Sequence, residues 1–554
     1  MSGRLKLQSN HPVLIFAGEE WSRLWQLSGQ AVDMTGSEVW IGTWEQFKAD
    51  HKARLPASEW RDAGYSDEFF ILMTETQLFL AGKSERGALY ALYQWAQEEW
   101  GIHAIYPGAA PVLTHGKPEG KRQAAAAGRG GQHTGIRWYA PRMERRGFVF
   151  ETINEPDYLK NMIEWFGHQK INEMFFTFSL WDQVGGELAE ELIKRGIQVT
   201  LGGHSMKFLL DKGKDKDKTA RTVEADHPYT AKEQLNFKDH AWQDRLLQDM
   251  AAYCKQVPNL ARISLWPEDI ADRDNEGFLE DYILFTEKLE AYLSQNGLDL
   301  EVEHIAYNAG LSWKMLERGK VESSAKVDTL YAYWGRDYRY GYKEDLHTNG
   351  SDRRALEAIE DWASATARAD QKLTVFEYYS DHFMLSNLFP FLPGRILQDV
   401  AYYEQLNLLG MVNLVVPYRG EEPYPWKWVH GLNSYVFAKA LWNDNLDEIM
   451  RDYYSCYAEH ERDSVRALFD TIESVLPQVT SWNIPLFPAR AADPEKATAT
   501  PENKQAVLTM LREIHSRIHS VIMQSQLQPE GEPYRYAQHL LNYTKELEQR
   551  WMTL

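Results

Sequence analysis

The chain has 554 residues, 44% of them hydrophobic, and a formal net charge of −20. This length is enough for about two to four domains with large buried cores. Because the chain is acidic and no block of Lys and Arg forms a basic face, nucleic acid is not an expected partner. No run of about 18 apolar residues predicts a membrane span, and the N-terminus lacks the apolar stretch of a signal peptide. A cytoplasmic protein without membrane contact is therefore expected.

Residues 1–108 have the pattern of a small α/β domain. The apolar segments at 12–17 and 38–43 are expected to be strands. Residues 68–82 contain two apolar runs around a polar turn, which predicts a hairpin. The domain is expected to end with one amphipathic helix.

That helix is expected over residues 84–101. Ser84 is a suitable N-cap, and Gly101 is placed to end the helix. Residues 109–145 follow, and much of this stretch is rich in Gly, Ala and charged residues without a clear period. This composition predicts a linker or a long exposed loop.

Residues 146–430 alternate between strand-like and helix-like segments with short connections. Eight such units in about 270 residues match the count and size of a (β/α)8 barrel. A doubly wound open sheet is the alternative, but it has no support from a Gly-rich dinucleotide motif. The expected strands are 147–153, 171–179, 197–203, 261–267, 300–308, 327–335, 373–380 and 410–417.

Residues 431–554 have mostly helical periodicity, which predicts a C-terminal helical region. These helices could pack on their own barrel or on a second subunit. A homodimer formed through them is therefore one expectation.

In such a barrel, the catalytic and binding residues lie at the carboxyl ends of the strands. The residues expected there are rich in carboxylates, aromatic rings, amides and Arg, with little Ser or Lys and no Cys. Acyl transfer and Schiff-base chemistry need an activated nucleophile, whereas glycoside hydrolysis needs two carboxylates, polar groups for hydroxyls and aromatic walls. An oligosaccharide is therefore the expected substrate. The predicted substrate contacts are His204, Trp181, Tyr307, Asn308, Tyr333, Trp334, Arg336, Tyr378 and Arg419.

Glu268 is the first candidate for a catalytic acid. It follows Trp266 and Pro267 at the end of the fourth strand, and apolar neighbours would raise its pKa as a proton donor requires. Asp269 is the second choice. The alternative interpretation places both carboxylates in the first turn of the next helix, where acidic residues are common.

Glu377 is the candidate for the partner carboxylate, because it interrupts an apolar strand and carboxylates are seldom buried without a reason. The alternative is a structural ion pair with Arg336 or Arg395. Asp337 is a further catalytic candidate, since it lies in a loop dense in aromatic residues and Arg. Its alternative is an ordinary surface turn.

Two predicted contacts have specific chemical interpretations. Arg336 and Arg419 could bind an anionic sugar bidentately, or they could form ordinary salt bridges. His204 could bind a hydroxyl, with Gly202 and Gly203 allowing close approach, or it could be a core histidine. No tight His/Asp/Glu spacing predicts a metal site, and two cysteines are too few for a thiolate site, so no metal or cofactor is expected.

Residues 79–108 resemble the domain that precedes the barrel in α-glucuronidases (glycoside hydrolase family 67) and in family 20 hexosaminidases. The segments 201–205, 234–250, 263–269 and 432–457 resemble the bacterial domain-of-unknown-function 4838 group, which is related to α-glucuronidases. The resemblance implies an N-terminal α/β domain, a (β/α)8 barrel, a helical C-terminal region and glycoside hydrolysis.

The chain departs from these families at two points. The hexosaminidase pattern has Asp then Glu after strand four, whereas this chain has Glu268 then Asp269. Asp337 and Glu377 match the glucuronidase base by strand position only. The resulting hypothesis is an exo-acting glycoside hydrolase, with a uronic-acid-containing oligosaccharide as one substrate. The alternatives are substrate-assisted hydrolysis of an N-acetylhexosaminide and a non-catalytic carbohydrate-binding protein on the same scaffold.

Overall fold

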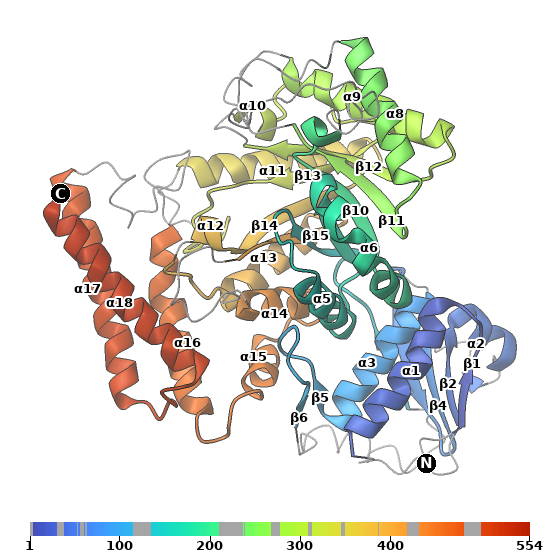
Figure 1. The fold of residues 1–554 in the computed structure, drawn as a ribbon, viewed down its shortest axis with the longest axis horizontal. Helices are drawn as coiled ribbons and strands as arrows, with labels where there is room; N and C mark the ends of the chain where they lie inside the picture. The colour runs from blue at the N-terminus through green and yellow to red at the C-terminus, as the bar shows by residue number, and fades with distance from the viewer. Residues whose placement is uncertain are drawn as a thin grey trace, which may run out of the picture.

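The computed structural model describes residues 4–29, 38–51, 54–55, 60, 64–114, 135–209, 237, 239–267, 277–308, 313–344, 350–385, 387–417, 431–480 and 500–554. The predicted site residues Glu268, Asp269 and Arg419 lie outside these ranges. Figure 1 shows an N-terminal sheet domain, a central barrel and a group of C-terminal helices. Every helix of the described ranges is too short or too polar to cross a bilayer.

The N-terminal domain is built on a five-stranded sheet with strand order β1-β2-β4-β3-β7. Its strands are β1 (Arg4–Leu7), β2 (Glu38–Thr43), β3 (Phe69–Met73), β4 (Gln77–Gly82) and β7 (Gly135–Tyr139). Its helices are α1 (Pro12–Leu27), α2 (Trp44–His51) and α3 (Glu85–Trp100), followed by a small ribbon of β5 (Ile102–His103) and β6 (Val112–Leu113). The predicted hairpin and the predicted helix are confirmed. β3 and β4 pair antiparallel, Ser84 accepts a hydrogen bond from the Gly87 amide, and Gly101 ends α3 with φ 66°.

Two parts of this domain differ from the sequence prediction. Residues 12–17 open helix α1 instead of forming a strand, because the buried side chains continue at helical spacing through Trp21 and Trp25. Strand β7 lies inside the predicted linker. It joins the sheet because Trp138 packs on Trp44 and Phe70, with ring centroids 5.2 and 4.9 Å away.

The predicted (β/α)8 barrel is confirmed, with eight parallel strands closed in the order β10-β11-β12-β13-β14-β15-β8-β9. The strands are β8 (Arg145–Phe150), β9 (Glu173–Thr177), β10 (Gln198–Gly203), β11 (Leu260–Leu265), β12 (Glu301–Tyr307), β13 (Asp328–Ala332), β14 (Leu373–Asp381) and β15 (Gly410–Val416). The helices between them are α5 (Pro156–Gln169), α6 (Phe178–Arg195), α8 (His240–Cys254), α9 (Phe278–Gln295), α10 (Trp313–Leu316), α11 (Gly350–Arg368), α12 (His382–Leu385) and α13 (Pro393–Gln405).

The amino ends of the strands are tied together inside the barrel by buried charges. Arg145 on β8 donates to Glu173 on β9 at 2.7 Å and to Glu303 on β12 at 2.6 Å. β8 and β12 face each other across the closed barrel, so these bonds cross its interior. Arg145 also donates to Thr374 Oγ1 at 3.2 Å, which shows that the Thr374 side of β14 faces inward. This network fixes the amino-terminal end of the barrel. In barrels of this kind, catalytic residues lie at the opposite, carboxyl-terminal end.

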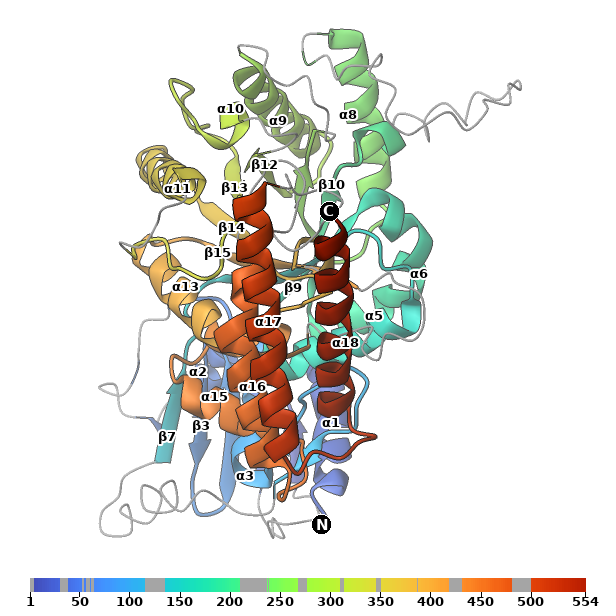
Figure 2. The ribbon, with the colours of Figure 1, turned by 90° about the vertical axis from the view of Figure 1, so that its left-hand side faces the viewer.

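The predicted C-terminal helical region is confirmed, and it packs on its own barrel. It contains α14 (Gly431–Ala440), α15 (Leu446–Tyr454), α16 (Arg462–Val475), the 3₁₀ helix η5 (Leu476–Thr480), α17 (Pro501–Gln524) and α18 (Glu532–Thr553). Figure 2 shows α17 and α18 side by side. Tyr536 on α18 donates to the Phe389 carbonyl at 2.5 Å, and Phe391 packs on Phe469 of α16 at 4.7 Å. These contacts anchor the helices to the segment between β14 and α13.

Candidate active site

The carboxyl ends of the barrel strands form the mouth, which we define by Glu151, His204, Trp266, Tyr307, Trp334, Tyr378 and Asp381. Trp266 follows β11, and its ring closes the barrel interior below the mouth. Its ring lies 5.2 Å from Phe175 of β9 and 5.6 Å from Phe376 of β14, and its Nε1 donates to Ser264 Oγ at 2.9 Å. Because β9 lies two positions and β14 three positions from β11 in the closed order, the Trp266 ring reaches across the interior and forms an apolar layer below the mouth.

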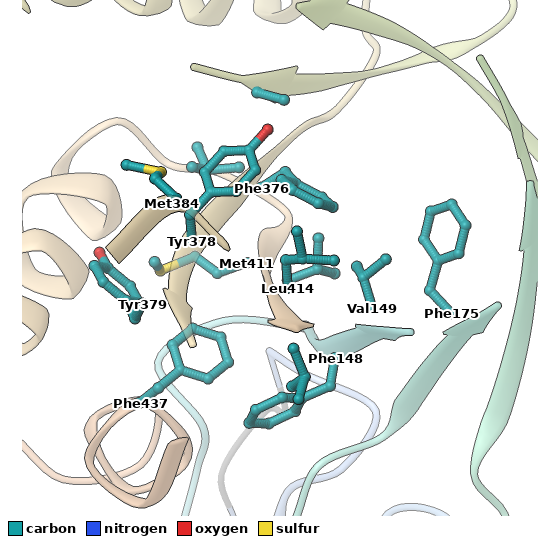
Figure 3. Close-up of a cluster of buried hydrophobic side chains, with 14 of the residues drawn as sticks. Phe148, Val149, Phe175, Phe376, Tyr378, Tyr379, Met384, Met411, Leu414 and Phe437 are labelled. Carbon is teal, nitrogen blue, oxygen red and sulfur yellow. The ribbon is translucent and has the colours of Figure 1, made fainter. Parts of the chain in front are cut away.

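Strand alternation decides which side chains of β14 reach the mouth. Phe376 contacts Trp266 inside the barrel, so Tyr378 two residues later shares this inward direction. Figure 3 shows the Tyr378 ring beside Phe376, whereas the Tyr379 ring lies apart, toward the helix that carries Phe437. The register with β15 shifts between Glu377 and Ser380, a bulge that bends this end of the strand.

His204 lies at the mouth, as predicted. Its Nδ1 is 2.6 Å from the Pro267 carbonyl oxygen, which can only accept, so Nδ1 carries a proton. The ring is 5.4 Å from Trp266 and 6.3 Å from Tyr307. Only glycine fits at the neighbouring position 202, because a Cβ on Gly202 would lie 1.7 Å from the Ser264 carbonyl oxygen of β11. The glycine thus allows close approach of a strand.

Two carboxylates that the sequence prediction did not select as catalytic, Glu151 and Asp381, are near enough to Tyr378 to act on the charge of its phenol. Burial raises the pKa of Tyr378 well above its usual value, and the charges of Tyr307, Asp381 and Glu151 add to this shift. Glu151 follows β8 and is half-buried, and its Oε1 lies 3.9 Å from where a Gly203 Cβ would stand. Asp381 Oδ1 accepts from the backbone of α12, which fixes its direction. Both carboxylates therefore belong to the mouth.

Trp334 and Asn308 form one wall of the mouth. Asn308 Oδ1 accepts from the Trp334 amide at 2.8 Å, and its Nδ2 donates to the Trp334 carbonyl at 2.7 Å. The predicted contact Asn308 thus holds the β13 loop in place. The Trp334 ring stacks on Phe383, which is 49% exposed, with an interplanar angle of 16°. The exposed Phe383 ring and the half-buried Trp334 ring offer apolar faces that suit the C–H face of a sugar.

Glu377 lies in a buried ion network behind the strand, which differs from its predicted catalytic placement. Its carboxylate accepts from Arg336 at 3.1 Å, from Tyr338 at 2.8 Å and from Tyr403 of α13. Arg336 also binds Asp399 of α13 with two bonds of 2.7 Å. Burial raises the pKa of Glu377, and the Arg336 guanidinium opposes that shift. The alternative interpretation, an ion pair with Arg336, is therefore confirmed.

Three other predicted residues also lie outside the mouth. Asp337 is buried and pairs with Arg339 at 2.6 Å, so it is not the surface turn of the alternative interpretation. Tyr333 donates to Asp352 of α11 at 2.9 Å. Trp181 on α6 packs on Phe176, on the outer side of β9. Tyr333 and Trp181 miss the mouth because their side chains point to the helical layer, whereas Asp337 is held by Arg339.

Asp352 provides a pH test of this helical layer. Burial raises its pKa from 3.8 to about 6, while the bond from Tyr333 opposes the shift. A raised pKa in the folded state means that the folded protein favours protonated Asp352. The resulting contribution to the free energy of unfolding is complete below about pH 4. It is lost as pH rises through 6, and the loss amounts to about 3 kcal/mol. In urea titrations from pH 4 to 7, the stability of wild type relative to Asp352→Asn should fall by about that amount. A pH-independent difference would contradict this assignment.

Within the described ranges, no three His, Cys, Asp or Glu side chains gather in a way that could hold a metal ion. The mouth residues that were not selected from the sequence are Glu151, Asp381 and Trp266, and Phe383 beside Trp334 was not selected either. A signal for Glu151 was present, because Arg145, Val149 and Glu151 share the inward alternation of β8.

Comparison with known proteins supports the fold. A GH138 enzyme described as targeting pectin rhamnogalacturonan II aligns with 99% of this chain and 68% of its own length, with a TM-score of 0.58 and 12% identity. CpGH84D aligns with 100% of this chain and 88% of its own, with a TM-score of 0.52 and 11% identity. No protein-family model and no curated protein matches the sequence. The resemblance to α-glucuronidases and the 4838 group therefore stays a prediction.

Proposed function

We propose that this protein is a glycoside hydrolase whose active site is the barrel mouth. The observation that carries the proposal is the pair of mouth carboxylates, Glu151 next to Gly203 and Asp381 at the start of α12, which both act on the charge of Tyr378. Glycoside hydrolysis needs two carboxylates, and aromatic faces suit sugar rings. The structural neighbours, which carry glycoside hydrolase family names, support the same reaction class.

Glu268 remains the proposed proton donor, because it follows Trp266 and Pro267 at the end of β11. For its partner we propose Glu151. β8 and β14 are each three or more positions from β11 in the closed order, so both Glu151 and Asp381 approach from across the mouth. Glu151 is favoured because Asp381 already caps α12. A carboxyl separation of about 5–5.5 Å would make Glu151 the nucleophile, and about 6.5–9.5 Å would make it the base for water.

The terminal sugar is proposed to be bound from its non-reducing end, in an exo-acting mode. A uronic acid there would need a cation. Arg336 is already saturated by Asp399 and Glu377, so only Arg419 of the two predicted arginines is left for that role. A neutral sugar is therefore favoured over a uronide by the described part of the mouth, which presents two carboxylates.

The proposal is tested by hydrolysis of neutral and uronic p-nitrophenyl glycosides and of the matching disaccharides. Wild type should release sugar from at least one of them. Glu268→Gln should lose about 10²–10⁴-fold in kcat/KM on the disaccharide and less on the nitrophenyl glycoside. The reason is that nitrophenolate leaves without needing a proton. Equal activity of wild type and Glu268→Gln on the disaccharide would contradict the donor role.

Substrate-assisted cleavage of an N-acetylhexosaminide is the second candidate. Trp266, Tyr307, Trp334 and Tyr378 provide the aromatic surroundings that an acetamido group requires. The adjacent acids Glu268 and Asp269 would then both be functional. A thiazoline inhibitor that competes with substrate would favour this mechanism, and one that leaves hydrolysis unchanged would count against it.

A further inference from the structure

A pocket of about 360 Å³ lies between the barrel and the C-terminal helices, apart from the mouth. It is formed by the segment after β13, the start of α13, and the junction of α16 with η5. Its volume is in the range of ligand pockets. Two of its lining segments, those after β13 and β14, leave the barrel at the carboxyl end of its strands, which is the end that carries the mouth.

The pocket is close to the mouth along the chain. Trp334 belongs to the mouth wall, and Tyr338, four residues later, lines the pocket. Four residues span at most about 14 Å, so the two sites lie within reach of one oligosaccharide.

The lining combines apolar surfaces with planar polar groups. Phe391, Leu392 and Pro477 provide the apolar part. Arg395, Gln398 and Gln478 provide guanidinium and amide groups, and Gln398 is exposed on α13. Planar groups of this kind can form paired hydrogen bonds with neighbouring hydroxyls, and the apolar surfaces suit the C–H face of a sugar ring.

The charges around the pocket argue against an anionic ligand. Arg339 is paired with Asp337 at 2.6 Å, and Arg395 with Glu344 at 2.8 Å. Glu473 adds a carboxylate, which accepts from the Gly394 amide at 2.8 Å. Because no positive charge is in excess among these described residues, a phosphate or carboxylate would gain little here. Hydroxyl groups, which both donate and accept, match this lining.

We infer that the pocket binds a neutral sugar unit of the oligosaccharide whose end is cleaved at the mouth. The inference rests on the proposed function for its substrate, but the binding step is separate from hydrolysis. The pocket then acts as a distal subsite that selects longer chains.

The inference is tested by titration calorimetry of the full chain with cellotriose, xylotriose, mannotriose and, as the acidic probe, trigalacturonate. At least one neutral trisaccharide should bind. Gln398→Ala/Gln478→Ala should weaken that binding at least tenfold, and Ser474→Trp should do the same by filling the pocket. The control Gln524→Ala removes an exposed amide on α17 and should bind like wild type.

The outcomes separate this inference from the proposed function. Pocket variants should keep wild-type kcat/KM on a p-nitrophenyl monosaccharide, which occupies the mouth alone. Unchanged trisaccharide affinity in both pocket variants, binding of trigalacturonate alone, or no binding of any probe would overturn the inference. Pocket-dependent binding by a protein that hydrolyses nothing would support the inference and contradict the proposed function.

Discussion

Replacement of Glu151 by glutamine is expected to lower kcat/KM for glycoside hydrolysis by about 10²–10⁴-fold. Glutamine keeps the size of the side chain but can neither accept a proton nor attack an anomeric carbon. Glu151 is half-buried at the end of β8, so the fold should tolerate the change. Steady-state kinetics on the best p-nitrophenyl glycoside would measure the loss, and the unfolding temperature would show that the fold is intact.

Asp381→Asn is the matched comparison for this variant. Asp381 caps α12 through Oδ1, which an asparagine oxygen can also do. If Glu151 is the partner of Glu268, Asp381→Asn should cost less activity than Glu151→Gln. Full activity in Glu151→Gln together with loss in Asp381→Asn would transfer the catalytic role to Asp381.

Replacement of Arg336 by methionine is expected to lower the free energy of unfolding by about 3–5 kcal/mol. Glu377 and Asp399 are each 2% exposed and would be left as two buried carboxylates without a cation. The pKa of Glu377, which burial already raises, would rise further without the guanidinium, so the loss should be small below about pH 4 and grow as pH rises above it. Urea unfolding at pH 4 and pH 7 would measure both effects.

Arg512→Met is the control for the loss of a guanidinium. Arg512 on α17 pairs with Glu548 on α18 at 2.6 Å, but its side chain is 53% exposed. Exposed pairs contribute at most about 1 kcal/mol, so this variant should stay close to wild type. A loss in Arg336→Met no larger than in Arg512→Met would contradict the structural role of the buried network.

The barrel could be predicted from the sequence because its signal is local. Each strand is a short apolar run between helical segments, and the eight predicted runs coincide with β8 to β15. The error at 12–17 has a simple cause, because six apolar residues fit a strand or a helix until Trp21 and Trp25 extend the period. Strand β7 was missed because its pairing partner, β3, lies more than 60 residues earlier.

The candidate site was harder to predict, because it depends on the direction of each side chain. His204, Tyr307, Trp334 and Tyr378 were proposed from their places at strand ends, and the structure places His204 beside Tyr307, with Tyr378 close enough to Tyr307 to interact electrostatically. Glu377 lies one residue from Tyr378 but points to α13. Successive side chains of a strand point to opposite faces, so an error of one residue assigns a side chain to the wrong face. The bulge after Glu377 also breaks this alternation, which cannot be read from the sequence.

We propose that hydrolysis occurs at the mouth and depends on Glu151, whereas Glu377 holds β14 to α13 through the buried ion network. The most direct test of this proposal is kcat/KM of Glu151→Gln and Glu377→Gln on one substrate, at a temperature below both unfolding transitions. We expect a loss of about 100-fold or more for Glu151→Gln. For Glu377→Gln we expect a loss of only a few-fold, together with a lower unfolding temperature. A large loss in Glu377→Gln with wild-type activity in Glu151→Gln would contradict the catalytic role of Glu151.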